Sequence, residues 1–163
     1  MKLKRGIKLL KSNGLTDVQK EQFINLLSQI EIDSIVIDKM QVEKLVDDLS
    51  ILENEDISVN ISFAIREIDP QITDSTLLLK PLVKIELLVN EKVLFFMRFV
   101  YSVVYIIKPE NKKNIEAILS DSDIKDYFIS KQVNKQLWPY LREEVSSTMS
   151  KCGLKPIYLQ LLR

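Results

Sequence analysis

Two pairs of adjacent acids, Asp47 with Asp48 and Glu143 with Glu144, are the residues whose types could perform acid–base chemistry in this chain. General acid–base catalysis needs two groups held at different pKa values beside a substrate. Neither pair has a positioned partner or a phosphate-binding loop near it in the sequence. We therefore interpret these acids as solvated charge, and Cys152 as a small packing residue at a helix end.

The residue types that are missing exclude several classes of chemistry. The chain has no histidine, so Ser-His-Asp and Cys-His catalysis and imidazole metal sites are excluded. Its glycines, Gly6, Gly14 and Gly153, cannot build a phosphate-binding loop or a dinucleotide-binding turn. We predict no enzyme activity, no ATP or NAD site, no metal and no other cofactor.

Composition and charge indicate a globular protein with a distinct start. The 163 residues are 46% apolar and 28% charged, with a net charge of zero, which suits one domain with a real core. Residues 1–14 hold five basic residues and no acid. We treat residues 1–14 as a basic leader, either solvated or a partner-binding or lipid-surface helix, and residues 15–163 as a single domain. Residues 31–69 are rich in acids.

The location of the protein is predicted from its cysteine count and its apolar runs. A single cysteine allows no intrachain disulfide and fits a reduced, cytoplasmic setting. No long apolar stretch or small-residue cleavage site follows the basic start. The longest apolar run, residues 93–107, is shorter than the ~20 residues of a spanning helix and contains Arg98. We expect no membrane insertion, and no nucleic-acid binding because the body of the chain is acidic.

Hydrophobic periodicity predicts one helix and then four strands. Apolar residues at three-to-four spacing predict a helix over residues 15–30, with Thr16 or Asp17 as its N-cap. The phase of the next segment shifts between Ile32 and Ile35, which predicts a bulge. The predicted strands are residues 30–38, 57–65, 82–89 and 93–107.

The connections and the later helices set the fold class. The sequence "NEK" predicts a short hairpin loop between the last two strands, and residues 45–56 are long enough to cross over between the first two. Beyond Pro109 the apolar spacing becomes helical, with two short helices and a long one near residues 138–152. The prediction is an α+β fold: a four-stranded antiparallel sheet with helices packed on one face, plus an extra N-terminal helix.

The last predicted strand is apolar on both faces. Helices can cover only one face of a single sheet, so the other face needs the N-terminal helix, another subunit or a client to cover it. We predict an oligomer interface on that second face, at Phe96, Val100, Val104 and Ile106.

Pro139 lies inside a helical pattern. A proline is tolerated in the first turn of a helix, where its missing N–H has no partner to lose. We therefore predict that the long helix begins near Trp138. Its apolar stripe is Leu141, Val145, Met149 and Cys152.

The stretch "LWPYLRE", residues 137–143, continues through Ser147 and opens this helix after four strands. It resembles the SecB-type protein-export chaperones. The resemblance implies a sheet-plus-helix protomer that assembles as a homodimer or a homotetramer, and a holdase that binds unfolded chains without ATP. The family includes chaperones tied to toxin–antitoxin pairs, so an antitoxin is one implied client.

The resemblance also implies sites. In that family the grooves lie between the main helix and the crossover after the first strand, and an export motor docks on acidic sheet residues. Here the implied motor-binding residues are Glu31, Asp33 and Asp38. The implied client-binding residues are Leu45, Leu49, Leu52, Trp138, Leu141, Val145 and Met149.

Two alternatives stay open at this point. Trp138, Leu141, Val145 and Met149 fit a core or a subunit interface as well as client contact. The whole chain also fits a SecB-like interaction or assembly scaffold that holds one folded partner instead of unfolded chains.

Overall fold

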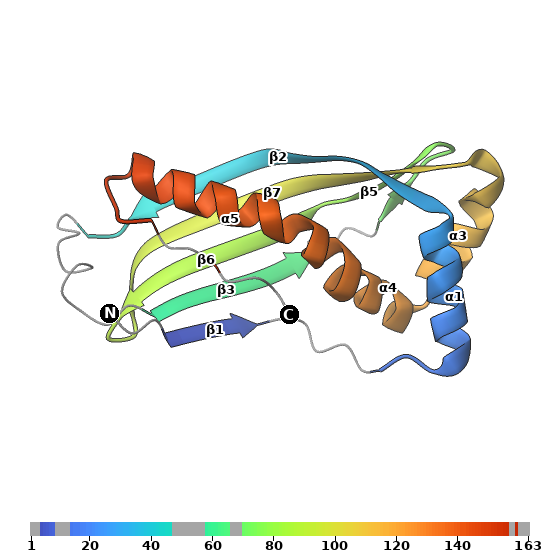
Figure 1. Cartoon of the computed structure of the whole chain (residues 1–163), viewed down its shortest axis with the longest axis horizontal. Helices are drawn as coiled ribbons and strands as arrows, with labels where there is room; N and C mark the ends of the chain where they lie inside the picture. The colour runs from blue at the N-terminus through green and yellow to red at the C-terminus, as the bar shows by residue number, and fades with distance from the viewer. Residues whose placement is uncertain (1–3, 9–13, 47–57, 66–69, 157–158, 160–163) are drawn as a thin grey trace.

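The computed structural model describes residues 4–8, 14–46, 58–65, 70–156 and 159. These residues form one curved sheet, with a long helix over one face and a cluster of shorter helices at one end (Figure 1). No helix in these ranges is long and apolar enough to cross a membrane.

The sheet is built around β7 (Lys92–Ile107). Along one side of β7 lie two strands end to end, β5 (Thr76–Leu79) and β6 (Pro81–Val89). Along its other side runs β2 (Ile30–Lys44), antiparallel to residues 95–107 of β7. Pro81 has no N–H to donate to a ladder, which accounts for the break between β5 and β6.

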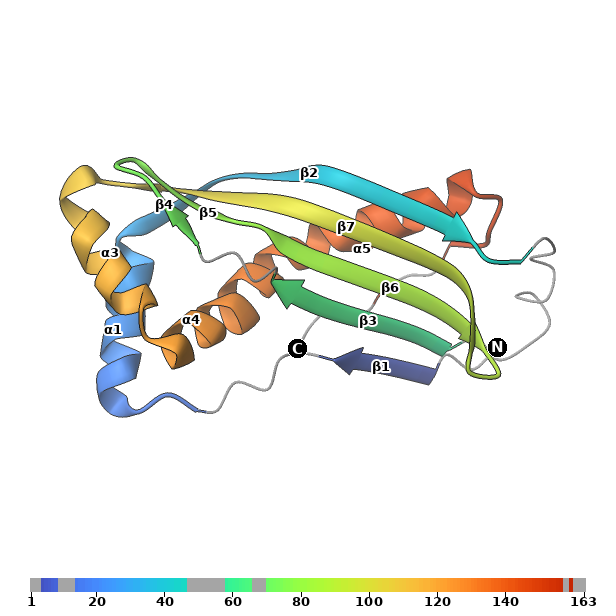
Figure 2. The same ribbon diagram turned by 180° about the vertical axis from the view of Figure 1, so that it is seen from behind.

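The remaining strands extend the sheet beyond these four. β3 (Ser58–Ile65) pairs antiparallel with β6, and β4 (Gln71–Ile72) pairs antiparallel with β5. β1 (Lys4–Lys8) pairs parallel with β3 and ends the sheet on that side (Figure 2). The prediction of four strands was wrong, because the described residues form seven. The mixed helix and antiparallel-sheet class is confirmed.

Two irregularities shape β2. The pairing with β7 shifts between Ile32 and Ser34, so the predicted bulge is confirmed. A second shift lies between Ile37 and Lys39. The strand continues to Lys44 instead of ending at residue 38, because each shift lets the apolar side chains return to the covered face.

The hairpin between β6 and β7 turns at Asn90 and Glu91. Both residues have positive φ angles, 50° and 64°, a conformation that matches the right-handed twist of the flanking strands. Asn tolerates this conformation better than most residues. The short hairpin loop predicted from "NEK" is confirmed.

The N-terminal helix α1 (Asp17–Ser28) packs at the end of the sheet instead of over a face. Thr16 is its N-cap, and a reciprocal bond pair with Gln19 forms a capping box. The ring of Phe23 meets Tyr127 edge-on at 5.1 Å between centroids. This contact joins α1 to the helix cluster, and therefore α1 is not the cover that the second sheet face lacks.

The helix cluster follows β7. A 3₁₀ turn η1 (Pro109–Asn111) leads into α3 (Lys112–Leu119), and α4 (Ser122–Phe128) is capped by the carboxylate of Asp121. The same carboxylate accepts from Gln19 Nε2 at 3.1 Å. This bond and the cap hold the pKa of Asp121 below its usual range.

The long helix α5 (Asn134–Lys151) begins earlier than predicted. It continues without a break from a π-helical turn, η2 (Ile129–Val133), and Pro139 lies inside it. The predicted start near Trp138 was therefore wrong. The buried face already includes Val133 and Leu137, so apolar packing extends the helix upstream of the proline.

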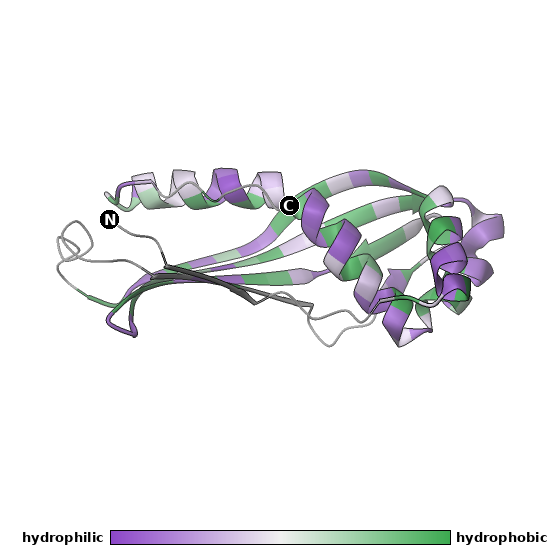
Figure 3. Ribbon diagram, turned by 60° about the horizontal axis from the view of Figure 1, so that its bottom comes forward, coloured by the Kyte–Doolittle hydropathy of each residue, from purple (hydrophilic) through white to green (hydrophobic). Residues whose placement is uncertain are grey.

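α5 runs over one face of the sheet (Figure 3). That face carries the buried alternate residues of the central strands, and α5 contributes its own buried stripe to the same core. The sheet side of this core includes Val83, Ile85, Leu87, Phe95, Met97, Phe99, Tyr101 and Val103.

Candidate functional site

The second face of the sheet is apolar in part and uneven in exposure. Val100 is only 5% exposed, whereas Ile106 is 48% exposed, and Phe96 and Val104 are half-buried. The four residues predicted as an oligomer interface thus lie on one face, where strand neighbours shield them to different degrees. Their role in assembly stays a prediction.

A polar cluster sits on this second face. Asp38 accepts from Lys80 Nζ at 2.9 Å and from Ser102 Oγ at 2.8 Å. The bond from Lys80 and then that from Ser102 hold the pKa of the Asp38 carboxyl below its usual range. Glu31 and Asp33, the other acids predicted to bind a motor, are exposed on the same strand. That role stays a prediction for all three.

The predicted client-binding residues of α5 are buried. Trp138, Leu141, Val145 and Met149 are at most 3% exposed and belong to the core. In this conformation they shape the helix packing and present almost no surface to a partner. Of the crossover residues, Leu45 is 50% exposed, while Leu49 and Leu52 lie outside the described residues.

Apolar side chains are exposed along the edge strand β2 and just past its end. They are Ile32, Met40 and Leu45, which are 40%, 51% and 50% exposed, and we call them the β2-edge surface. Ile32 and Met40 pair with inward-facing residues of β7, whereas the alternation places Leu45 on the opposite side, next to the core-packed Val46. Met40 faces the helix, since its Sδ accepts from Thr148 Oγ1 of α5 at 3.8 Å. A long edge strand with exposed apolar residues is a site where another chain can bind.

The sequence analysis missed Met40. Its signal was present, because Met40 and Val42 continue the alternation of β2 with one residue between them. Both pair with inward-facing residues of β7, Phe99 and Met97. The phase change at the second bulge made the strand look as if it ended at Asp38.

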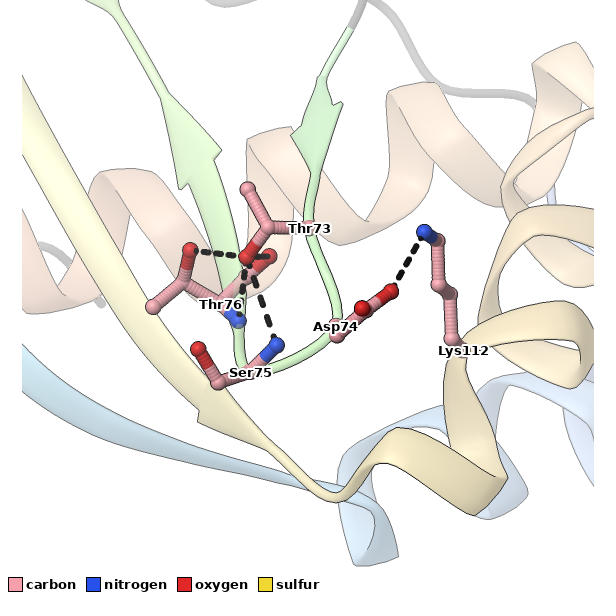
Figure 4. A network of polar contacts seen from close by, with 5 residues as sticks. All are labelled: Thr73, Asp74, Ser75, Thr76 and Lys112. Atoms are coloured by element: carbon pink, nitrogen blue, oxygen red, sulfur yellow. Dashed lines mark hydrogen bonds and ion pairs between the residues drawn. The ribbon is translucent and has the colours of Figure 1, made fainter.

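A polar network connects the β4–β5 turn to α3 (Figure 4). Asp74 accepts from Lys112 Nζ at 2.8 Å, which holds the pKa of that carboxyl below its usual range. Thr73 Oγ1 accepts from the backbone N–H of Thr76 at 3.0 Å and from that of Ser75 at 3.3 Å. These contacts close a turn and tether it to a helix.

Two buried tyrosines of β7, Tyr101 and Tyr105, have shifted pKa values. Burial raises the pKa of Tyr101 and Tyr105, and the charge of Glu144 adds to the effect on Tyr101. Tyr105 Oη donates to Gln136 Oε1. Both hydroxyls stay protonated at neutral pH, but Tyr101 Oη is buried without a hydrogen-bond partner among the described residues. The described residues include no group of acids or thiols that could hold a metal ion.

The outward side of α5 is polar. A shallow pocket there is lined by Pro139, Arg142, Glu143, Ser146, Ser147, Ser150 and Leu159. Its lining residues are mainly polar in type, but more of the wall area is apolar than polar. The pocket is therefore a second candidate for apolar binding, beside the β2-edge surface.

Comparison with known proteins identifies the fold. Neither a scan against family models nor a search of curated proteins finds a match. Among solved structures, a SecB-like chaperone of Mycobacterium tuberculosis, in complex with a ChAD peptide from the HigA1 antitoxin, superposes with a TM-score of 0.66. The two chains are 12% identical, and the likeness covers 89% of this chain and 99% of that one. This chain therefore has a SecB-like fold, as its resemblance to that family predicts.

A protein of unknown function from Streptococcus agalactiae is also similar, with a TM-score of 0.40 and 7% identity, over 82% of this chain and 98% of that one. No argument rests on this weaker likeness.

Proposed function

We propose that the protein is an ATP-independent holdase chaperone that binds unfolded or nascent polypeptides. The observation that carries the proposal is the β2-edge surface, a set of exposed apolar side chains along the edge strand β2 of a SecB-like fold. An unfolded chain presents the apolar side chains that a folded protein hides, so it matches this surface in chemistry. Leu49 and Leu52, which lie outside the described residues, stay proposed client-binding residues from the sequence.

The mechanism is apolar burial repeated over several weak patches. Fully burying one leucine-sized side chain contributes about 1.5–3 kcal/mol, which alone gives weak binding. Several patches that engage one extended client bind more tightly, because the first contact raises the effective concentration of the others. Such contacts are non-directional, which suits clients of many sequences.

The client class follows from the same surface. We propose two uses, protection of a dedicated client such as an antitoxin, or delivery of chains for export in the cytoplasm. The antitoxin peptide bound by the Mycobacterium tuberculosis chaperone supports the first use. Docking of an export motor on Glu31, Asp33 and Asp38 belongs to the second use.

The aggregation of diluted, denatured luciferase and malate dehydrogenase tests the proposal. We expect this protein to suppress their light scattering at near-stoichiometric ratio, equally with and without ATP, because binding alone performs the work. Leu45→Ser should weaken suppression with little change in the melting temperature, since surface substitutions usually change stability by less than ~0.5 kcal/mol.

The matched control is Val18→Ser in the first turn of α1, where the side chain is 67% exposed and does not belong to β2. It removes the same kind of exposed apolar group and should leave suppression unchanged. Equal loss in both variants would show that the β2-edge surface has no special part in capture.

We also propose that the protein is a homodimer or homotetramer. The second sheet face supports this, because its half-buried apolar residues would be fully buried against another copy. Size exclusion with light scattering should give the mass of a dimer or a larger oligomer. Val104→Asp should lower this mass, because a charge without a partner is unfavourable in an apolar interface. Val18→Asp places the same charge on α1 and should leave the mass unchanged. A monomeric wild-type protein at micromolar concentration contradicts the proposal.

The second candidate function is a scaffold that holds one folded partner. The same sheet face favours it, since a folded protein could cover that face as well as another copy. A protein that leaves both aggregating clients unaffected but binds one folded partner tightly would establish the scaffold instead.

A further inference from the structure

The strand β1 occupies an edge of the sheet in an unusual way. Every other strand pair in the described sheet is antiparallel, whereas β1 runs parallel to β3. Its register places Lys4 opposite Ser58 and Lys8 opposite Ser62. β1 is thus a strand added onto an edge that β3 would otherwise expose (Figure 2).

The local sequence gives β1 little reason to be a strand. Its five residues are KRGIK, and lysine and glycine are depleted in strands. Gly6, in the middle, has no side chain to pack and loses more backbone entropy than other residues on becoming ordered. Parallel pairing is also slightly weaker per residue than antiparallel pairing. β1 therefore has a weak propensity for strand and pairs with one neighbour alone.

The edge beneath β1 does not depend on it. β3 pairs with β6 along its whole length, from Ser58 opposite Leu88 to Ile65 opposite Pro81. β1 covers only residues 58–62 of this edge. If β1 leaves, β3 stays in the sheet and presents a row of unpaired N–H and C=O groups.

We infer that the outer edge of β3 is a strand-addition site for an extended segment of a client polypeptide, and that β1 closes this site in the resting protein. The inference rests on the proposed holdase function, whose clients are extended chains with free backbone groups. Added strands bind mainly through main-chain hydrogen bonds, so this edge accepts many sequences. The covalent link to the rest of the chain raises the effective concentration of β1 at this edge, so weak peptides do not displace it.

The test locks β1 onto β3 in the full chain. Gly6→Cys and Asn60→Cys change two residues that lie opposite each other in the pair, and Cys152→Ser removes the native thiol. Opposite Cα atoms in neighbouring strands lie within the range that a disulfide spans. The probe is fluorescein-labelled α-lactalbumin, reduced and carboxymethylated so that it stays unfolded, and the readout is fluorescence anisotropy.

We expect the oxidised protein to bind this probe at least ~10-fold more weakly than the Cys152→Ser parent, because the site stays closed, and dithiothreitol to restore binding. A control disulfide between Lys84→Cys and Arg98→Cys joins β6 and β7, which remain paired in any case, and should leave binding unchanged. Equal binding by the oxidised Gly6→Cys/Asn60→Cys protein overturns the inference while the holdase function stands.

Hydrogen exchange of the wild-type chain provides a second measurement that needs no disulfide. On adding the probe, backbone amides of residues 4–8 should lose protection while those of residues 58–65 keep theirs. If the probe binds and residues 4–8 stay protected, β1 does not leave and the inference fails. If the disulfide forms between two chains instead of within one, β1 exchanges between copies, which also overturns it. A wild-type protein that binds no probe refutes the holdase function itself.

Discussion

Replacing Leu141 with alanine is expected to lower the free energy of unfolding by about 2–5 kcal/mol. The side chain is 0% exposed and lies in the core between α5 and the sheet. Truncation removes its apolar burial and leaves a cavity that rigid neighbours fill only in part. Urea melts with an unchanged slope would measure the change.

The control for Leu141→Ala is Leu45→Ala, which truncates a leucine that is 50% exposed. Leu45→Ala should lower the free energy of unfolding far less than Leu141→Ala does. It should nevertheless weaken the capture of unfolded chains more than Leu141→Ala, when both are compared at equal amounts of folded protein. The opposite result, a loss of capture with full stability in Leu141→Ala, would mean that clients reach the residues facing the sheet. Trp138, Leu141, Val145 and Met149 of α5 would then contact clients directly, as the resemblance to the SecB-type family implies.

Replacing Pro139 with alanine is expected to raise the free energy of unfolding, by up to about 3 kcal/mol. Pro139 lies past the first turn of α5, where the helix begins at Asn134. In a helix interior a proline ring crowds the carbonyl four residues earlier, here that of Lys135, and supplies no N–H to it, whereas alanine can supply this bond. The midpoint of urea unfolding should rise accordingly.

Ser146→Ala serves as the control for Pro139→Ala, because it adds alanine to the same helix without restoring a bond. Helix propensity alone should give it at most about 0.7 kcal/mol. If Pro139→Ala gains no more than this control, the neighbouring π-helical turn already accommodates the proline. A gain in stability with a loss of capture would assign Pro139 a part in positioning α5.

The long strands were predictable because each buries alternate side chains, which gives the sequence a two-residue alternation of apolar residues. β6 and β7 follow their predicted ranges within one residue. β5 was not predicted, since only Lys80 separates it from β6 and the run of leucines continues across it. β1 was not predicted either, because its place depends on pairing with a distant strand and not on its own residues.

The site was predictable only in part. The stretch at residues 137–143 indicated the correct fold. The burial of Trp138 and of the apolar stripe of α5 depends on how the helix packs on the sheet, which the stretch alone does not give. Met40 was missed because a second bulge moves the alternation by one residue beyond Ile37. Bulges are tertiary features, set by the partner strand, so a single strand pattern cannot locate both.

The pairing of β2 with β7 has a consequence for synthesis of the protein. Lys44 pairs with Phe95 and Ile30 with Ile107, so β2 leaves the ribosome long before its partner exists. At ~5–20 residues per second this delay is on the order of seconds. During that time the newly made β2, with its apolar residues unpaired, has the same features as the chains that the finished protein is proposed to bind. Completed copies would then act first on their own nascent chains.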